Sequence, residues 1–331
     1  MQPRSLTCYF QRTFFVIISL VFAFSVFSVP KAEAADKVKL RLHWKVGAEH
    51  VAFIVAMDKG FYDQEGIDIS IKEGSGSTAT LKLIGAGKET FGVCGTNVTV
   101  KGVAKGVPVI QVMLIEANKT QGVLSRPEAG IRTPQDLRGK IIAGSGSGVS
   151  DIFEAFLAAN KLSIKDLTYL AAGKARLQVV ASGRADGSLG NAMNDVLRLK
   201  AMGVSSPQTL LFNEWGLPPI GDGIIANLRT VKTEKDMVRR FVKASIRGIN
   251  YTFMDIEKSA EIAKKHFPMT NKEQLVKQLA ALKWLFNPPI GWQDPKVVAG
   301  IKNVIAEFGG MPQAKNMPVG KFFTNEFLPK F

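Results

Sequence analysis

Hydrophobic and polar positions follow two alternating patterns along most of the chain. In VKLRLHW, residues 38–44, apolar and polar side chains alternate with a period of two, which predicts a β-strand with one buried face. The next segment, HVAFIVAMDKGFY, is largely apolar over the length of a helix and ends near Gly60. Further strands are predicted at IDISI, TFGVC and VPVIQVMLIE, and helices at STATLKLIGAG and TVKGVAKG. This order predicts parallel βαβ units and a doubly wound sheet.

A second series of strands and helices begins with the predicted strand GVLS, Gly122–Ser125. It continues with strands at KIIAG, LTYLA, ADGSL and TLLFN and with helices between them. Thr133 and Pro134 in TPQDL are typical of the first residues of a helix. The second series therefore predicts another α/β unit.

From Thr233 onward the apolar residues have helical spacing. Thr233 and Asp236 form one predicted capping pair, and Thr270 and Glu273 form another. We interpret the apolar stripes of these helices as faces that pack against a core.

The N-terminal segment has the order of a secretory signal peptide. Arg4 and Arg12 precede the apolar run FFVIISLVFAFSVFSV, and small residues at Ala32–Ala34 follow it. We predict cleavage after Ala34, so that residues 1–34 are not part of the fold. A membrane anchor is the alternative, but the run is shorter than the roughly 20 residues of a spanning helix. No later segment qualifies, and no Cys for lipid attachment lies beside the cleavage site.

Composition narrows the class of protein. The formal charge of +15 predicts attraction to anions, yet Lys and Arg are scattered without interleaved aromatic residues. A solvated basic surface is therefore the preferred interpretation, and no nucleic-acid partner is predicted. Removal of Cys8 with the signal leaves Cys94 without an intramolecular disulfide partner. We interpret Cys94 as a small buried side chain and not as a nucleophile.

Signatures of enzymes and metal sites are mostly absent from the sequence. His43, His50 and His266 do not have the spacing of a metal cluster. No zinc-protease helix, nucleophile elbow or phosphate-binding lysine loop occurs. No metal and no cofactor is predicted.

A Gly-Ser turn, GSGSGVSD at Gly144–Asp151, follows a predicted strand and opens a helix. Its glycines do not have the spacing of the dinucleotide fingerprint. Backbone N–H groups and the hydroxyls of Ser145 and Ser147 could bind an anion or a polar ring, whereas an ordinary turn with a serine cap is the equal alternative. The turn EGSGSTAT, with Gly74 and Ser75, is predicted to face it across a cleft.

Polar and aromatic residues stand where predicted strands end. Trp44 ends the first strand and His50 opens the next helix, Thr96 and Asn97 follow TFGVC, and Asn191 follows ADGSL. Ligands of open α/β sheets bind outside the carboxyl ends of strands, so we predict that these side chains converge. Trp44 offers a flat stacking face. The alternatives are burial of Trp44 in the interdomain core and a capping or surface role for His50.

Five segments occur in a characteristic order along the mature chain. They are LHWKVGAEHVAFIVAMDKGFYDQEGIDISI, GAGKETFGVC, AKGVPVIQV, IRTPQDLRGKIIAG and VRRFVKASIRGINY. This order resembles the periplasmic solute-binding proteins of importers for nitrate, sulfonates, taurine and the pyrimidine precursor of thiamine. In the last branch a Trp is followed six positions on by a His, as Trp44 and His50 are here. Lys45, Val46 and Ala52 depart from that branch, so the resemblance does not name the ligand.

The resemblance implies two doubly wound α/β lobes joined by a two-segment hinge, as in periplasmic binding proteins of type II. We place lobe 1 at residues 35–121 and 223–331 and lobe 2 at residues 122–222, with crossings near Gly122–Ser125 and Asp222–Asn227. The implied function is capture of a small polar organic or anionic solute in the periplasm and its delivery to the inner-membrane permease of an ABC importer. The implied receptor is a monomer that performs no chemistry on the solute.

Two other functions remain open from the sequence. A pyrimidine-precursor-synthesising enzyme has a related fold, but the export signal and the lack of a His/Cys-rich segment argue against it. A sensor-type binding protein would signal instead of importing. The predicted ligand-binding residues are Trp44, His50, Gly74, Ser75, Thr96, Asn97, Ser145, Ser147, Asn191 and Trp215.

Overall fold

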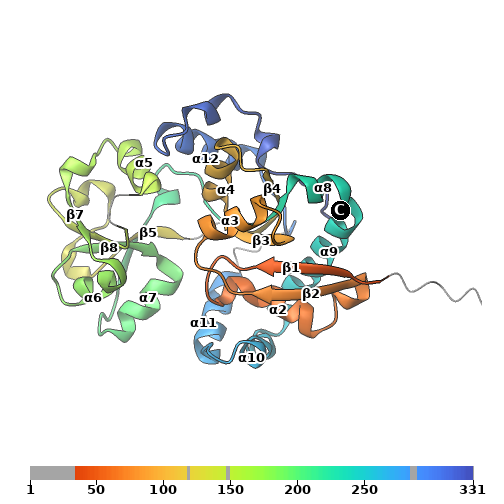
Figure 1. Ribbon diagram of the computed structural model, residues 1–331. Coiled ribbons are helices and arrows are strands. Elements are labelled where there is room, and N and C mark those ends of the chain that lie inside the picture. Colours follow the sequence, from red (N-terminus) through yellow and green to blue (C-terminus); the bar gives the residue numbers. More distant parts are fainter. Residues whose placement is uncertain (1–33, 118–119, 147–149, 284–288, 331) are drawn as a thin grey trace, which may run out of the picture. The chain divides into compact units, whose positions relative to one another are not determined.

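Two five-stranded mixed sheets with flanking helices form the framework of the protein in this computed structural model (Figure 1). The structure describes residues 34–117, 120–146, 150–283 and 289–330. Residues from Asp36 onward belong to one compact unit. Residues 1–33 of the predicted signal peptide lie outside the described residues. Among the described helices, none has the length and apolar character to cross a membrane.

Each sheet contains one strand that runs against its neighbours. The strand orders are β2-β1-β3-β10-β4 and β7-β6-β8-β5-β9. Strand β10 is antiparallel to β3 and β4, and β5 is antiparallel to β8 and β9. These are the two segments that the sequence predicts as crossings. The strands are β1 Asp36–Arg41, β2 Ile67–Lys72, β3 Phe91–Gly95, β4 Val109–Glu116, β5 Gln121–Ser125, β6 Ile141–Gly144, β7 Thr168–Ala171, β8 Gly187–Asn191, β9 Gln208–Leu211 and β10 Asp222–Asn227.

Helices connect most of the parallel strands and continue the chain after the last strand. They are α2 Ala48–Asp58, α3 Ser77–Gly85, α4 Thr96–Ala104, α5 Asp151–Ala159, α6 Arg176–Ala181, α7 Ala192–Ala201, α8 Leu228–Thr233, α9 Lys235–Met254, α10 Ile256–His266, α11 Lys272–Leu282 and α12 Pro295–Glu307. Helices α9 to α11 pack with α2 on the first lobe. The order of strands and helices confirms the predicted α/β class.

Alternation in the first strand sets which face is buried. Val38, Leu40 and Leu42 are buried, as the period of two predicts. Trp44 is 56% exposed instead, although it has the same parity as the other three. The reason is that β1 ends at Arg41, so the chain turns before Trp44 and releases it from the buried face.

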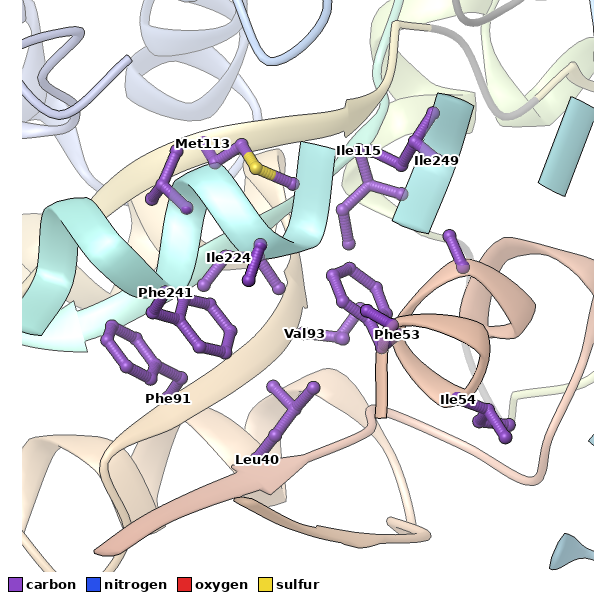
Figure 2. Close-up of a cluster of buried hydrophobic side chains, with 14 of the residues drawn as sticks. Leu40, Phe53, Ile54, Phe91, Val93, Met113, Ile115, Ile224, Phe241 and Ile249 are labelled. Atoms are coloured by element: carbon purple, nitrogen blue, oxygen red, sulfur yellow. The ribbon is translucent and has the colours of Figure 1, made fainter. Parts of the chain in front are cut away.

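The core of the first lobe lies between its sheet and the helices α2 and α9. Figure 2 shows the rings of Phe91, from β3, and Phe241, from α9, beside each other within this cluster. Their centroids are 3.9 Å apart and their planes differ by 12°. Tyr62 stacks on the same Phe241 at 5.5 Å. Such buried aromatic contacts attach the late helix α9 to the first βαβ unit.

A second hydrophobic cluster joins the other sheet to the C-terminal helix α12. Phe153 and Phe156 of α5 lie against Phe212, and the cluster also includes Ile301 and Ile305 of α12. Helix α12 contacts α4 of the first lobe as well as α5 of the second. The C-terminal region therefore packs on both lobes, although the predicted boundaries assign residues 223–331 to lobe 1. Those boundaries stay a proposal.

Two predicted helix caps are wrong. Thr233 is the last residue of α8, where its hydroxyl donates to the carbonyl of Arg229, so it cannot open α9. Asn271, and not Thr270, caps α11 by accepting from the backbone N–H of Gln274. Several neighbouring residues near the start of each helix could act as its N-cap. Tertiary packing decides which of them has the extended backbone that an N-cap needs.

Two other local predictions are confirmed. Cys94 in β3 is fully buried. Thr133 and Pro134 begin a helix as predicted, a short 3₁₀ helix at Pro134–Leu137.

Candidate functional site

A cleft of about 310 Å³ lies at the edge where strands of both sheets end. Glu116 is the last residue of β4 and Asp222 is the first of the antiparallel β10, so both stand at the same edge of their sheet. Asn191 ends β8 of the other sheet. The cleft is lined by His43, Trp44, Glu49, Glu116, Asn191, Met193, Asn194 and Asp222.

A larger cavity of about 710 Å³ adjoins this cleft and shares Trp44, Glu49 and Asn194 with it. Its wall includes an ion pair in which Lys45 Nζ lies 2.7 Å from a carboxylate oxygen of Glu73. Burial alone would raise the pKa of Glu73, but hydrogen bonds from Lys45 and from the backbone of Val46 lower it below its usual value. Glu73 is therefore a carboxylate at neutral pH.

The indole of Trp44 lines both cavities. Its exposed fraction of 56% excludes the alternative that it is buried in the interdomain core. A flat apolar face at the mouth of a cleft can stack on a planar ligand. The structure therefore places Trp44 where the sequence predicts a wall of the site.

A chain of hydrogen bonds joins the first turn of α2 to the cleft. The backbone N–H of Gly47 donates to His50 Nδ1 at 3.1 Å. His50 Nε2 lies 3.0 Å from His43 Nδ1. His50 is completely buried, whereas His43 lines the cleft. His50 therefore does not line the cleft itself, but it contacts two residues that do, His43 and, at 3.7 Å, Glu49.

Two carboxyl groups of the cleft are cross-strand neighbours. Glu116 and Asp222 are register partners in the β4–β10 ladder, and they are 3% and 1% exposed. Like charges directly opposite each other on a sheet are destabilising, and burial increases that cost. His43 Nε2 approaches Asp222 at 3.7 Å. Three of the eight described residues that line the cleft are acidic, Glu49, Glu116 and Asp222.

The second lobe presents the start of α7 to the cleft. Asn191 Oδ1 accepts from the backbone N–H of Asn194 and from the hydroxyl of Thr120, both at 3.3 Å. Asp195, which is buried, accepts from the backbone of Asn191 at 3.0 Å and binds Arg176 at 2.7 Å. These contacts hold the Asn191 side chain in one orientation beside the cleft.

Comparison with known families decides which family the chain belongs to. The sequence model of NMT1/THI5-like proteins matches residues 47–258, more than half of the chain. The chain belongs to the NMT1/THI5-like family. The matched range includes Glu116 and Asp222 of the cleft, whereas His43 and Trp44 precede it.

Some relatives of this NMT1/THI5-like protein are named for biosynthesis, and another is named for binding. A putative thiamine biosynthesis protein of Haemophilus influenzae is 26% identical over 204 residues, which cover 61% of this chain and 65% of that protein, just under two thirds of its length. The formylaminopyrimidine-binding protein of Halalkalibacterium halodurans is 22% identical over 276 residues, 79% of this chain and 82% of the relative. A 4-amino-5-hydroxymethyl-2-methylpyrimidine phosphate synthase of Saccharomyces cerevisiae is 24% identical over 258 residues, with 74% and 75% coverage.

Solved structures share the fold. The periplasmic aliphatic sulphonate binding protein of Escherichia coli superposes with a TM-score of 0.67, at 15% identity, over 86% of this chain and 91% of that one. This likeness confirms the predicted periplasmic-binding-protein fold with two lobes.

The first Gly-Ser turn of this NMT1/THI5-like chain supports the end of β1. The backbone N–H groups of Gly74 and Gly76 donate to the carbonyls of Trp44 and His43 at 3.2 and 2.7 Å. A Cβ on Gly74 would lie 2.0 Å from the carbonyl oxygen of Leu42, so only glycine permits this approach. Gly74 thus positions His43 and Trp44 and does not line the cleft. Ser75 is exposed and is also absent from the lining.

Other predicted site residues lie away from the cleft. Thr96 is buried and lines a separate cavity of about 190 Å³, where its hydroxyl donates to Gln111 at 3.3 Å. Asn97 is half-buried in the first turn of α4 and is not among the lining residues. Trp215 packs against the hydrophobic cluster of α5 and α12. Their ligand-binding roles stay predictions, without support from position.

The second Gly-Ser turn does not reach the cleft in its described part. Ser145 is exposed, and Ser147 lies outside the described residues. The carbonyl of Gly146 accepts from the hydroxyl of Tyr169 at 3.0 Å. Ser150 caps α5 by accepting from the backbone of Phe153 at 3.3 Å. These contacts support the alternative of an ordinary turn with a serine cap.

Sequence reasoning missed five acceptor or donor groups of the cleft. They are His43, Glu49, Glu116, Asn194 and Asp222. Glu116 and Asp222 had a usable signal, since each is an acidic residue at the end of a strongly apolar strand. Their pairing was not visible, because it depends on β10 inserting antiparallel beside β4.

The histidine pair also bears on metal binding. Side-chain atoms of His43, Glu49 and His50 lie within 4.8 Å of one another. However, His50 Nδ1 already accepts the Gly47 N–H, so the neutral ring carries its proton on Nε2, the atom that faces His43. A metal ion would have to replace that proton and the hydrogen bond it forms. The donor set therefore fits a hydrogen-bonded pair better than a metal centre.

Proposed function

We propose that this protein is a solute-binding receptor that captures a small planar organic ring bearing hydrogen-bond donors and delivers it to the permease of an ABC importer. The observation that carries the proposal is the cross-strand pair Glu116 and Asp222, which is buried and lines the same cleft as Trp44. Carboxylates accept hydrogen bonds and bind no further anion, so they select for N–H groups.

The described lining of the smaller cleft is acidic, which disfavours an oxyanion ligand. Of the described residues that line the smaller cleft, none is Lys or Arg, although the whole chain carries a formal charge of +15. Two like charges 4 Å apart repel by about 4 kcal/mol at an effective dielectric constant of 20. Sulfonate and nitrate are therefore disfavoured, and a neutral or cationic nitrogen-containing ring is favoured.

Two further features support this ligand class. Trp44 supplies a stacking face for a planar ring, and the side-chain amide of Asn191 faces the same space. The similarity to the formylaminopyrimidine-binding protein agrees with a nitrogen heterocycle. Closure of the two lobes over such a ligand would be a hinge motion whose equilibrium the ligand shifts.

We further propose that the receptor acts in the periplasm as a monomer, after cleavage of residues 1–34. The predicted signal motif and the fold shared with a periplasmic binding protein support this location. Purification from the periplasmic fraction followed by intact-mass measurement tests it, and a chain that retains Met1 or carries a lipid contradicts it.

A pyrimidine-forming enzyme is the second candidate, favoured by the similarity to the yeast synthase. A receptor returns its solute unchanged, whereas a synthase converts its substrate into a product. Repeated mass spectra of protein and ligand during incubation distinguish the two functions.

Native mass spectrometry of freshly isolated protein tests the ligand class. We expect a bound small molecule with at least one N–H donor and no net negative charge. Glu116→Gln should weaken its binding, whereas Glu128→Gln, which changes a carboxylate that is 71% exposed, should not. Recovery of a sulfonate or nitrate as the tightly bound solute contradicts the proposal.

A further inference from the structure

A cavity of about 190 Å³ lies apart from the cleft and shares no described lining residue with it. It borders the adjacent ends of β4 and β10, because Ala117 directly follows Glu116 and Gly221 directly precedes Asp222. These chain segments are in close contact, since a Cβ on Gly221 would lie 1.7 Å from the carbonyl oxygen of Glu116. The cavity therefore lies beside both segments through which the chain passes between the two sheets.

Most of the cavity wall is apolar. Its apolar side chains include Leu114 of β4, Pro219, Trp292, and Val297, Val298 and Ile301 of α12. Among the lining residues that the structure describes, Asp294 alone carries a charge, and its carboxylate accepts from the backbone N–H of Lys296 at 2.8 Å as the N-cap of α12. Such walls favour a neutral and largely apolar occupant.

The polar side chains of the cavity bond to one another. Thr96, Gln111 and Gln293 are all buried. The Thr96 hydroxyl donates to Gln111 Oε1 at 3.3 Å, and Gln111 Nε2 donates to Gln293 Oε1 at 2.7 Å. Gln293 Nε2 donates in turn to the carbonyl of Thr324 at 3.1 Å. Because these groups have partners within the protein, an occupant is not required to supply hydrogen bonds to them.

Trp292 gives the cavity an exposed aromatic wall. It is 46% exposed, although its neighbours Gly291 and Gln293 are buried. A large exposed apolar side chain beside an apolar cavity is typical of a binding site, and an indole face can stack on a second aromatic ring. A dry apolar cavity of about 150 Å³ is large enough to hold benzene, so the volume of this cavity suits one small aromatic ring system.

We propose that this cavity is a second binding site, which takes one neutral aromatic molecule of one or two fused rings and stacks it on Trp292. The occupant contacts α12 and the ends of β4 and β10 at once. It therefore adds a contact between the C-terminal helix and the segments that connect the two sheets. This site is independent of the solute proposed for the cleft.

Indole is the probe for this site. Calorimetric titration of wild type should show saturable binding of one indole per chain, and saturating indole should raise the melting temperature. In nitrogen-15 spectra of tryptophan-labelled protein, the ring N–H signal of Trp292 should shift with the same saturation curve, and Trp292→Ala assigns that signal. Indole-3-carboxylate should bind at least about tenfold more weakly, because its charge would have to be buried among apolar walls.

Two valines of α12 provide a matched pair of variants. Val297 and Val304 are both half-buried and pack against the same hydrophobic cluster, but Val304 is absent from the cavity lining. Val297→Phe places a ring of its own in the space and should weaken indole binding at least about tenfold, whereas Val304→Phe should leave it unchanged. Trp292→Ala removes the stacking face at an exposed position and supplies the test if Val297→Phe does not fold. Trp44→Ala changes the cleft alone and should bind indole as wild type does.

The outcomes separate this site from the cleft. Absence of saturable indole binding to wild type overturns the proposal. Wild-type affinity for indole in Trp292→Ala and in folded Val297→Phe, as judged by thermal melts, also overturns it. Indole binding that is lost in Trp44→Ala places the probe in the cleft and overturns the second site as well. The receptor function stands in each case, because it concerns the other cavity.

Discussion

The hydroxyl oxygens of Tyr62 and Ser245 lie 2.9 Å apart in a hydrogen bond that joins the first βαβ unit to α9, 183 positions away. Both side chains are fully buried. Ser245 donates its own proton to the carbonyl of Phe241 at 2.8 Å, so Tyr62 is the donor of the pair. Burial raises the pKa of Tyr62, which keeps the phenol protonated.

Removing the hydroxyl of Tyr62 and removing that of Ser245 should destabilise the fold by different amounts. Tyr62→Phe leaves only an acceptor lone pair of Ser245 unfilled and should cost about 1 kcal/mol of unfolding free energy. Ser245→Ala leaves a buried phenol without its acceptor and should cost more, about 1 to 3 kcal/mol. Denaturant unfolding of the single and double variants measures both costs. Equal costs, or strict additivity in the double variant, would contradict this assignment of donor and acceptor.

Trp44 should contribute to binding and little to stability. Trp44→Ala removes a stacking face and should weaken binding of the recovered solute at least about tenfold, while the melting temperature of the ligand-free protein stays nearly unchanged. Trp292→Ala is a matched control, because Trp292 is 46% exposed and lines the separate cavity near Thr96. A large loss of melting temperature in Trp44→Ala with normal affinity would show that Trp44 is a packing residue.

The pair Glu116 and Asp222 should lower the stability of the ligand-free protein and raise its affinity for the ligand. Glu116→Gln replaces a carboxyl that is 3% exposed by an uncharged amide of similar shape, which lowers the cost of burial, so the ligand-free protein should melt at a higher temperature. The same change removes an acceptor for the ligand, so the affinity should fall. Thermal melts and calorimetry on one preparation measure both effects. A lower melting temperature together with unchanged affinity would indicate a structural role for the pair.

Acid should weaken one contact between α2 and α10. Hydrogen bonds from Lys265 and then His266 lower the pKa of Asp58 below its usual value. A carboxyl whose folded pKa is lowered adds stability above its unfolded pKa, and that contribution is lost as the pH falls through the folded pKa. Asp58→Asn should therefore be less stable than wild type at pH 7, and the difference should shrink toward pH 3. Parallel melting curves of the two proteins across this range would contradict the assignment.

Local pattern was enough to predict most of the elements. The alternation at Val38–Leu42 and the turn signal at Thr133 and Pro134 correspond to an observed strand and a 3₁₀ helix. The starts of α9 and α11 were misplaced, because several residues near each start can cap a helix and their sequence preferences are nearly equal. Element type depends on many residues, whereas an element boundary depends on one or two.

Two of the ten predicted site residues line the cleft. Trp44 and Asn191 line it, because both stand at strand ends, which the sequence identifies. His50 was expected to line the site, with a capping or surface role as the alternative. The structure supports the capping role, because His50 is buried behind His43 and accepts from the backbone N–H of Gly47 at the start of α2. The rings of His43 and His50, which are seven positions apart in the sequence, meet because β1 ends at Arg41 and the chain then turns.

By itself the sequence determined the alternating α/β order, the predicted export signal and the strand ends at which a ligand can bind, since these follow from local periodicity and from residue type. Only the tertiary structure decided the chemistry of the cleft. Glu116 and Asp222 are more than a hundred positions apart, and they become neighbours because β10 pairs antiparallel with β4. The contact between the rings of His43 and His50 likewise depends on the turn that follows β1. Strand register and hydrogen-bond direction are properties of long-range contacts, and no local pattern of residues encodes them.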